Sequence, residues 1–430
     1  MLKEKIKSRS AKVGILGLGY VGLPLACEFA KAGFAVTGFE VDSRKVTSLL
    51  AGKSYIEDIP TPVVKDLVRR RRLTATTDFS RLQQVDVCII CVPTPLNKTK
   101  DPDITYIADS AKQITKYLHR EQLIVLESTT YPGTTRELVL PMMEAKGFKV
   151  GRDFYLAFSP ERIDPGNKQF QLPNTPKVVG GITSTCGQLA QLLYGQIVQR
   201  VVPVSSPEAA EIVKLLENTF RAVNIGLVNE IALICDRLGL NVWEIIEAAA
   251  TKPYGFMPFY PGPGLGGHCI PIDPHYLSWK MKSLNFSARF IDLAGEVNSH
   301  MPEFALEKVV RSLNARKKSV NGSTILILGV AYKANVSDMR ESPALDLIHL
   351  LEGRGAKVRY HDPFVPSVTI SGKRYVSKAY TPALLRSNDV VVVTTNHSVF
   401  NAKEILKYAK LVVDTRNMMR GLSAPHLVRL

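Results

Sequence analysis

The chain has 430 residues, of which 45% are hydrophobic, so it is too long for one core and should form two or three domains. Its net charge of +16 leaves nucleic acid, an anionic surface and small anionic ligands to be weighed as partners. The first ten residues are polar and basic, and no apolar run reaches about eighteen residues. We therefore expect a cytoplasmic protein without signal peptide or membrane span.

The first part of the chain alternates short apolar runs with helical patterns. Residues 21–31 predict a helix that ends at Gly33. The predicted strands cover residues 12–19, 35–42, 85–93 and 123–129. This alternation is typical of a doubly wound parallel sheet. Cys88 and Cys91 lie within one of these apolar runs, so a buried core role is favoured over a redox or metal site, and we expect no metal.

The middle of the chain is helical. Residues 205–238 predict one long helix, which starts with a capping box formed by Ser205 and Glu208 and stops at Gly239. Shorter helices should cover residues 242–250 and 289–313, and Pro302 should kink or restart the second of these.

Short strands return near the end of the chain. They are expected at residues 323–332, 357–363, 388–396 and 410–417. The predicted fold class is therefore α/β, with two doubly wound Rossmann-like domains joined by a helical region. We place the domains at residues 1–203, 204–314 and 315–430. The long spine helix of the central domain is a candidate dimer surface.

A glycine motif follows the first predicted strand. Gly17, Gly19 and Gly22 have the G-x-G-x-x-G spacing and open a predicted helix, as in dinucleotide-binding domains. An acidic residue about twenty positions later should bind the adenosine ribose. Glu40 and Asp42 both fit, and Glu40 is preferred because it lies nearer the strand end. An acid there favours NAD over NADP.

A cysteine follows a segment rich in glycine and proline, "PGPGLGGHCIPIDP". The glycines would let a ligand approach the backbone closely. Cys269 has His268 beside it and Asp273 four positions on, and the spacing alone leaves a catalytic and a structural role equally open. Together with NAD, a nucleophilic cysteine would permit a four-electron oxidation, from alcohol through a thiohemiacetal and a thioester to an acid.

Three polar residues of the predicted spine helix share one face. Lys214, Asn218 and Arg221 have i, i+4, i+7 spacing, and apolar residues such as Leu215 and Leu216 fall on the opposite face. By itself, such a polar face predicts exposure to solvent. The basic run from Arg69 to Arg72 is likewise interpreted as the solvated end of a helix.

The ordered motifs resemble those of the UDP-sugar 6-dehydrogenases. They are "GILGLGYVGLPLA", "CVPTPL", "ESTTYPGTT", "FSPERIDPGN", "KLLENTFRAVNI", "PGPGLGGHCIPIDP" and "GVAYKANVSDMRES". The resemblance implies an NAD-binding domain, a central helical domain that forms a homodimer or a larger assembly, and a C-terminal UDP-binding domain. It implies surface-polysaccharide precursor synthesis.

The resemblance also implies residue roles. Cys269 would be the nucleophile, Asp273 and Lys214 would manage the proton and the hydrolytic water, and Asn218 would hold the oxyanion. Glu161 would support acid–base work. The NAD contacts implied by the motifs are Gly17, Gly19, Tyr20, Val21, Gly22, Glu40, Lys45, Pro93, Thr94, Thr129 and Arg340, and Thr129 would also position water. The implied substrate contacts are Glu161, Arg162, Ile163, Lys214, Asn218, Arg221, Tyr260, Gly266 and Lys333.

Two positions separate this chain from the UDP-glucose branch. Arg162 and His268 stand where that branch has other residues, and both patterns are similar to the UDP-N-acetylhexosamine branch. We rank N-acetylglucosamine first, then N-acetylgalactosamine, then N-acetylmannosamine, and UDP-glucose remains an alternative. A single-hydride β-hydroxyacid dehydrogenase would need no cysteine. A nucleic-acid-binding protein is disfavoured because basic and aromatic residues are not interleaved.

Overall fold

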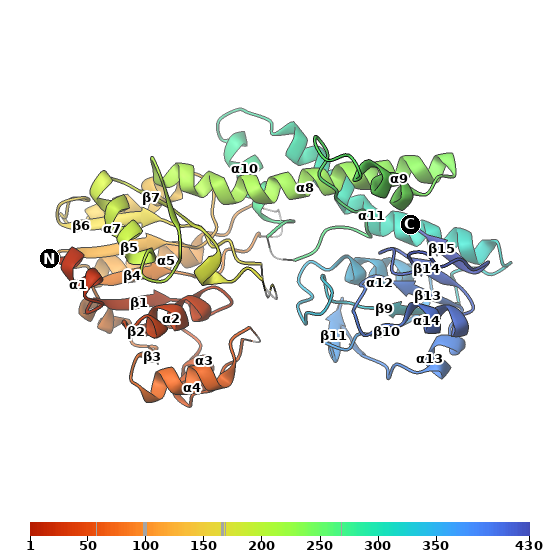
Figure 1. The fold of residues 1–430 in the computed structure, drawn as a ribbon, viewed down its shortest axis with the longest axis horizontal. Coiled ribbons are helices and arrows are strands. Elements are labelled where there is room, and N and C mark those ends of the chain that lie inside the picture. The colour runs from red at the N-terminus through yellow and green to blue at the C-terminus, as the bar shows by residue number, and fades with distance from the viewer. Residues whose placement is uncertain (57, 98–100, 165–166, 168, 268) are drawn as a thin grey trace. The chain divides into compact units, whose positions relative to one another are not determined.

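The computed structural model describes residues 1–56, 58–97, 101–164, 167, 169–267 and 269–430. The chain forms two compact units. The first unit consists of Met1–Glu217 and Trp279–Phe286, and the second of Asn218–Ser278 and Ser287–Leu430. Each unit is built around one mainly parallel sheet with helices on both faces (Figure 1).

The sheet of the first unit has the strand order β3-β2-β1-β4-β5-β6-β7-β8. Neighbours are parallel except β6 and β7. The first six positions reproduce the strand order of dinucleotide-binding folds, so the predicted Rossmann-like sheet is confirmed. The strands are β1 (Lys12–Leu16), β2 (Ala35–Phe39), β3 (Leu73–Thr76), β4 (Val87–Ile90), β5 (Gln122–Leu126), β6 (Phe154–Phe158), β7 (Lys177–Gly181) and β8 (Val201–Val204).

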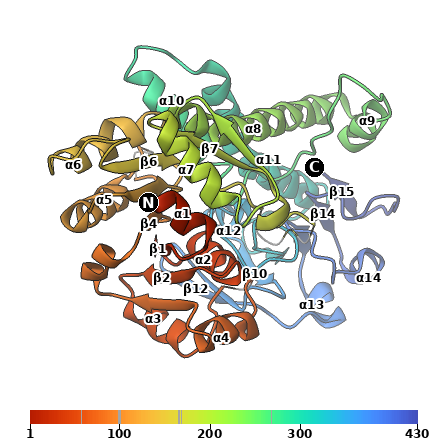
Figure 2. The same cartoon turned by 60° about the vertical axis from the view of Figure 1, so that its left-hand side comes forward.

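Helices cover both faces of this sheet because successive strand residues point to opposite sides. Ile15 and Ile89 pack with α2 and α7, whereas Leu16 and Ile90 pack with α5. Figure 2 shows the helices α2, α5 and α7 around this sheet. Cys88 is buried in the core, as predicted. The helices are α1 (Leu2–Lys7), α2 (Gly22–Lys31), α3 (Ser43–Leu50), α4 (Thr61–Arg69), α5 (Thr105–Tyr117), α6 (Leu140–Glu144) and α7 (Ser184–Tyr194).

The helical middle of the chain consists of α8 (Pro207–Leu238), α9 (Val242–Ala249), α10 (Asp273–Lys282) and α11 (Arg289–Asn314). The predicted cap at Ser205 is wrong by one residue, because the Ser206 hydroxyl accepts a hydrogen bond from the Ala209 N–H at 3.2 Å. Of the two alternatives predicted for Pro302, the restart is excluded because α11 continues through this residue, and the kink stays a prediction. No helix in the described ranges is long and apolar enough to cross a membrane.

The second unit contains a parallel sheet in the order β10-β9-β13-β14-β15. Ile325 and Val392 face α11 and α12, and Leu326 and Val391 face α13 and α14. The predicted second α/β fold is therefore confirmed. Its elements are β9 (Thr324–Leu328), α12 (Pro343–Gly353), β10 (Lys357–His361), the hairpin β11 (Ser367–Ile370) and β12 (Lys373–Val376), α13 (Pro382–Ser387), β13 (Val390–Val393), α14 (Ala402–Tyr408), β14 (Val412–Asp414) and β15 (Leu427–Arg429).

Candidate active site

The glycine motif forms an open cradle between β1 and α2. A Cβ at Gly17 would lie 2.6 Å from the Cys91 carbonyl oxygen, and a Cβ at Gly22 would lie 1.9 Å from the Gly17 oxygen. These two glycines are therefore required by packing. At Gly19 a Cβ would meet nothing within 4 Å. The open space in front of Gly19, beside the N-terminus of α2, fits the approach of a dinucleotide diphosphate.

The two candidate ribose acids have different surroundings. Glu40 is buried directly after β2, where its carboxylate accepts hydrogen bonds from the Leu18 N–H at 3.1 Å and from Lys45 at 3.2 Å. Asp42 instead caps α3 and pairs with Arg44, whose hydrogen bonds lower the pKa of Asp42 to about 2. The geometry favours Glu40, which is tied to the glycine cradle itself.

The other predicted cofactor residues follow strands of the same sheet. Exposed Tyr20 and half-buried Val21 follow β1, Pro93 and buried Thr94 follow β4, and Thr129 follows β5. Ligands of open α/β sheets bind at the carboxyl ends of the strands, and these residues are placed there.

A cation and two carboxylates are buried together in the first unit. Lys177 Nζ lies 2.9 Å from Glu127 Oε2 and 3.2 Å from Glu161 Oε2. Tyr194 donates its hydroxyl to the other oxygen of Glu127. Burial opposes the ammonium of Lys177, but the two carboxylates raise its pKa. In the described residues, no group of three or more His, Cys, Asp or Glu could hold a metal.

Glu161 is committed to its own loop. Its Oε1 accepts hydrogen bonds from the backbone N–H groups of Arg162 and Ile163. Burial tends to raise the pKa of Glu161, but Lys177 and these hydrogen bonds hold it below its ordinary value. The carboxylate therefore stays ionised and orients the segment that carries Arg162.

Two predicted residues in the first unit have partners on neighbouring elements. Lys214, from the start of α8, donates a hydrogen bond to the Thr129 hydroxyl at 2.6 Å. Arg162 forms a two-pronged ion pair with Glu217 of α8 and also donates to the Pro176 carbonyl at 2.8 Å. Thr129, Lys214, Glu161 and Arg162 are thus held near the ends of β5 and β6.

The polar face of α8 is buried at Asn218 and exposed at Arg221. Asn218 is only 3% exposed; its amide nitrogen donates to Asp273 and its carbonyl accepts from Arg221. Among the residues assigned to the apolar face, Leu216 is 61% exposed. The expectation that the polar face points to solvent is therefore wrong for Asn218, because Asp273 at the start of α10 covers it.

The segment before Cys269 lies against the C-terminal part of the second unit. Gly267 has φ +86° and its N–H donates to the Arg340 carbonyl at 3.1 Å. A Cβ at Gly266 or Gly267 would lie 2.6 or 2.8 Å from atoms of Tyr332. Glycine is therefore required here because the Tyr332 side chain lies close to the backbone. His268 lies outside the described residues.

Cys269 itself is half-buried, whereas the other five cysteines, all in described segments, are buried. Its carbonyl accepts hydrogen bonds from the N–H groups of Ile272 and Asp273 at 3.1 and 2.8 Å. These bonds fix the backbone of Cys269 at the entry to α10. Cys269 is thus the accessible thiol of the chain, which a nucleophilic role requires.

Three further predicted residues also lie in the second unit. Lys333 is half-buried and directly follows Tyr332. The guanidinium of Arg340 pairs with Asp338 at 2.7 Å. Tyr260 is half exposed and stacks on Trp243, with ring centroids 6.2 Å apart.

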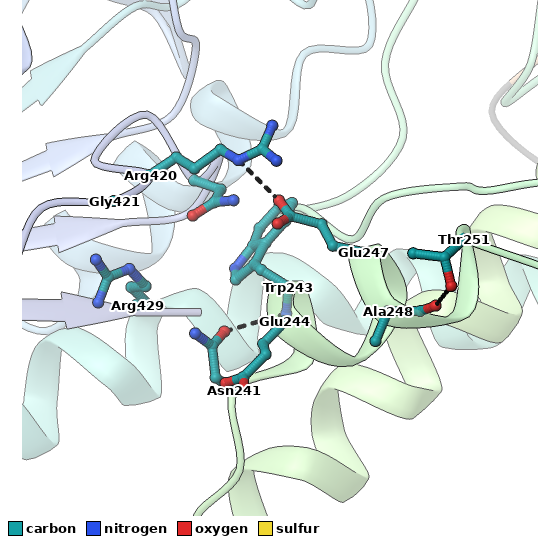
Figure 3. Close-up of a pocket in the computed structure, with 10 residues that line it drawn as sticks. Asn241, Trp243, Glu244, Glu247, Ala248, Thr251, Arg420, Gly421 and Arg429 are labelled. Carbon is teal, nitrogen blue, oxygen red and sulfur yellow. Dashed lines mark hydrogen bonds and ion pairs between the residues drawn. The ribbon is translucent and has the colours of Figure 1, made fainter.

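A separate pocket of about 490 Å³ lies in the second unit between α9 and the end of the chain (Figure 3). Trp243 and Glu247 line it from α9, and Arg420 and Arg429 line it from the C-terminal segment. Arg420 pairs with Glu247 at 3.0 Å. None of the predicted site residues is part of its lining.

Sequence reasoning missed several buried polar groups. Glu127 directly follows β5 and Lys177 is the first residue of β7 in the first sheet, and Asp362 and His397 follow strands of the second. The sequence could have indicated them, because each is a charged or titratable residue beside an apolar strand. Burying such a residue is energetically unfavourable unless it has a partner. The partners, however, come from distant parts of the chain.

Comparison with known proteins gives matches along most of the chain. Residues 11–198, 208–300 and 326–421 match the NAD binding, central and UDP binding domains of the UDP-glucose/GDP-mannose dehydrogenase family. A UDP-N-acetyl-D-glucosamine 6-dehydrogenase from Pseudomonas aeruginosa is 33% identical over 407 residues, covering 94% of this chain and 95% of its own length. An NDP-N-acetyl-D-galactosaminuronic acid dehydrogenase from Ralstonia solanacearum is 34% identical over 416 residues, covering 94% and 96%. The solved structure of a UDP-D-ManNAc dehydrogenase from Pyrococcus horikoshii has a TM-score of 0.88 at 32% identity, covering 97% of this chain and 98% of that one.

Proposed function

Since this chain belongs to the UDP-glucose/GDP-mannose dehydrogenase family, we propose that it oxidises the C6 hydroxymethyl group of a UDP-N-acetylhexosamine to the uronic acid. NAD is the cofactor. Each of the two oxidations would use a separate NAD molecule, which supplies the hydride acceptor when bound. The Gly17–Gly22 cradle and Glu40 would hold it. We propose UDP-N-acetylglucosamine as the first candidate substrate.

One observation carries the proposal. Cys269 is the accessible cysteine of the chain and follows a glycine segment that lies on Tyr332. Its thiolate would attack the C6 aldehyde left by the first oxidation and form a C–S bond. Loss of the second hydride would convert this thiohemiacetal to a thioester. Water would then add to the thioester carbon, the C–S bond would break and the thiolate would leave as the acid forms.

The other catalytic residues that the resemblance implies suit the proton transfers. Lys214, held by Thr129 at 2.6 Å, would stabilise the alkoxide of the substrate hydroxyl and take up its proton. Thr129 would position the attacking water. Asn218 has a second amide N–H for the oxyanion, and Asp273 orients that amide while serving as the base for water. Because Glu161 is already tied to Lys177 and its own loop, we assign it the orientation of Arg162 and Ile163.

The family resemblance implies a set of substrate contacts. Arg162 is the proposed contact to the sugar, and Glu217 fixes the plane of its guanidinium. Arg221, Tyr260, Gly266 and Lys333 are the further proposed contacts. The relatives carry names for different N-acetylhexosamines. The ranking of N-acetylglucosamine first rests on the motif around Cys269 and remains a proposal.

The test is the number of NADH molecules released per molecule of limiting sugar nucleotide at excess NAD. UDP-N-acetylglucosamine, its galacto and manno isomers and UDP-glucose are assayed in parallel. Two NADH from an N-acetylhexosamine, with uronic acid as product, support the proposal. One NADH would mean that oxidation stops at a carbonyl, as in a β-hydroxyacid dehydrogenase, and the role of Cys269 would be wrong. Turnover of UDP-glucose alone would overturn the substrate class.

We also propose that the central helices form a homodimer. Exposed apolar side chains recur along α8, namely Ile212, Leu216, Phe220, Leu227 and Ile234. Their spacing of three to four residues, or a multiple of it, places them along one stripe of the helix. A second copy would cover this stripe, and a monomeric mass by light scattering would contradict the proposal.

A further inference from the structure

The segment that carries Tyr332 and Lys333 is fastened at both ends. We call residues 329–335 the clamped segment. It leaves β9 at Gly329, whose N–H donates to the His361 carbonyl at 2.9 Å. At its far end Asn335 has φ +64°, and its side-chain carbonyl accepts from the Ser398 N–H at 2.9 Å. A left-handed non-glycine residue persists only when its surroundings hold it in place.

Asp362, directly after β10, holds the near end. One of its oxygens accepts from the N–H groups of Val330 and Ala331 at 2.7 and 3.0 Å. The other accepts from the N–H groups of Phe364 and Val365 at 2.8 and 3.1 Å. Burial acts to raise the pKa of Asp362, but the hydrogen bonds from His397 and the backbone keep it below its ordinary value. An ionised carboxylate can satisfy all these donors, whereas an amide cannot.

His397 joins Asp362 to the far end of the segment. Its Nδ1 lies 2.9 Å from the Asn335 N, which can only donate, so Nδ1 must accept. The proton of the neutral ring is then on Nε2, which donates to Asp362 at 3.0 Å. Both side chains are fully buried. His397 is therefore fixed in one tautomer by two partners, and each of its ring nitrogens holds one end of the clamp.

The clamped segment in turn supports the segment before Cys269. Tyr332 lies under Gly266 and Gly267, at distances where an added Cβ would collide with it. The Tyr332 N–H is itself fixed by the Asp338 carbonyl at 3.0 Å. A shift of Tyr332 would therefore move the backbone two residues before Cys269. Asp362 and His397 would act on the glycine segment through Tyr332.

We propose that Asp362 and His397 are positioning residues for the proposed oxidation, because they hold the clamped segment so that Tyr332 supports the Cys269 backbone and Lys333 is presented to the substrate. This inference rests on the proposed function for its kinetic consequence. Its structural part, the link from His397 through Tyr332 to the glycine segment Gly264–Gly267, stands on contacts within one unit.

The test uses graded variants of His397 in the full-length protein. His397→Asn keeps an acceptor at the Nδ1 position, His397→Gln keeps a donor at the Nε2 position, and His397→Leu keeps neither. Three quantities are measured: hydrogen exchange of peptides that contain Gly264–Gly267, the rate of Cys269 alkylation by iodoacetamide, and kcat and KM for the sugar nucleotide. Cys269 is half-buried and the other five cysteines are buried, so the alkylation rate reports on Cys269.

The mobility of the glycine segment Gly264–Gly267 should increase with the number of His397 hydrogen bonds that a variant loses. We expect exchange of the glycine segment and the alkylation rate to change least in the Asn and Gln variants and several-fold in the Leu variant. Because a misplacement of about 1 Å can cost about 100-fold in rate, kcat should fall about 10- to 100-fold in the Leu variant. Tyr332→Ala should reproduce the exchange change, and combining it with His397→Leu should add little.

Asp389→Asn is the matched control. Asp389 accepts from the Thr324 N–H at 2.9 Å and from Lys318, at the opposite end of β9. The Asp389→Asn variant should have a lower free energy of unfolding, with unchanged hydrogen exchange of Gly264–Gly267 and an unchanged rate of Cys269 alkylation. Equal changes in Asp389→Asn and His397→Leu would overturn the inference, and if the Leu variant does not fold, the Asn and Gln variants decide it. If wild-type protein releases no NADH from any UDP-sugar, the proposed function fails, while exchange and alkylation still decide the positioning role.

Discussion

Replacing Lys177 by methionine should destabilise the first unit strongly. The substitution keeps most of the apolar volume and removes the cation that lies 2.9 Å from Glu127 and 3.2 Å from Glu161. All three residues are buried. The variant would retain two carboxylates in the interior without their shared counter-ion.

The size of the effect follows from the two lost bonds. A hydrogen bond to a charged group contributes about 1.5–3 kcal/mol. Two such bonds give about 3–6 kcal/mol, which agrees with the cost of about 3–5 kcal/mol for removing one partner of a buried ion pair. For domains of about 150–250 residues, 1 kcal/mol shifts Tm by about 2–4 °C. We therefore expect the Tm of the first unit to fall by about 6–20 °C.

The loss of stability in Lys177→Met should depend on pH. Burial already raises the pKa of Glu127 above its ordinary value of 4.5, and loss of Lys177 removes a charge that opposes this rise. A carboxyl group whose pKa is higher in the folded state stabilises the fold below its unfolded pKa. That contribution is lost as pH rises through the folded pKa. The deficit of Lys177→Met should therefore be smaller at pH 5 than at pH 8.

Differential scanning calorimetry at both pH values measures these effects. Lys112→Met is the matched control, because Lys112 pairs with Asp109 at 3.2 Å on the surface, where such pairs contribute about 0–1 kcal/mol. Lys177→Met combined with Glu127→Gln should recover part of the loss. A Tm within about 2 °C of that of the control at pH 8 would refute the reasoning.

The remaining predictions concern the site itself. Cys269→Ser should reduce NADH release at least about 100-fold while NAD affinity by calorimetry stays unchanged; wild-type turnover would exclude the covalent route. Gly267→Ala should reduce both stability and kcat, because φ is +86° and Tyr332 blocks the Cβ, whereas Gly322→Ala, with φ +81° and open space, should cost only about 1–2 kcal/mol of backbone strain. Glu40→Gln should weaken NAD binding by about 10- to 100-fold, the effect of one charge-assisted hydrogen bond, and an unchanged Kd would show that another residue binds the ribose.

Local patterns predicted much of the fold. Apolar β-branched runs bounded by turn residues predicted β1, β2, β4 and β5 of the first sheet and β9, β10, β13 and β14 of the second, whereas β3, β6, β7, β8 and β15 were not predicted. The family resemblance is confirmed along the chain. Gly17 and Gly22 could be identified because their constraint is a turn of a few residues. The start of α8 was misplaced by one residue because Ser205 and Ser206 are chemically equivalent candidates for the cap.

What the sequence did not predict depends on contacts between distant residues. Asn218 and Asp273 are fifty-five positions apart, and helical periodicity alone cannot show that Asp273 of α10 covers Asn218 of α8. Glycine at 266 and 267 suggested room for a ligand, yet in the structure these positions leave room for Tyr332. Glycine is therefore required at these two positions by packing against Tyr332, which only the folded structure reveals.

The hydrogen bonds of Glu161 indicate that Glu161 and Asp273 have different roles. Glu161 accepts from two backbone N–H groups and from Lys177, and its pKa is held low, so it is a poor proton carrier and a strong anchor for its loop. Asp273 accepts from the side chain of Asn218, in the unit that contains Cys269. A base for thioester hydrolysis has to act beside the thioester, which in the proposed mechanism forms on Cys269. We therefore propose the anchoring role for Glu161 and the hydrolytic role for Asp273.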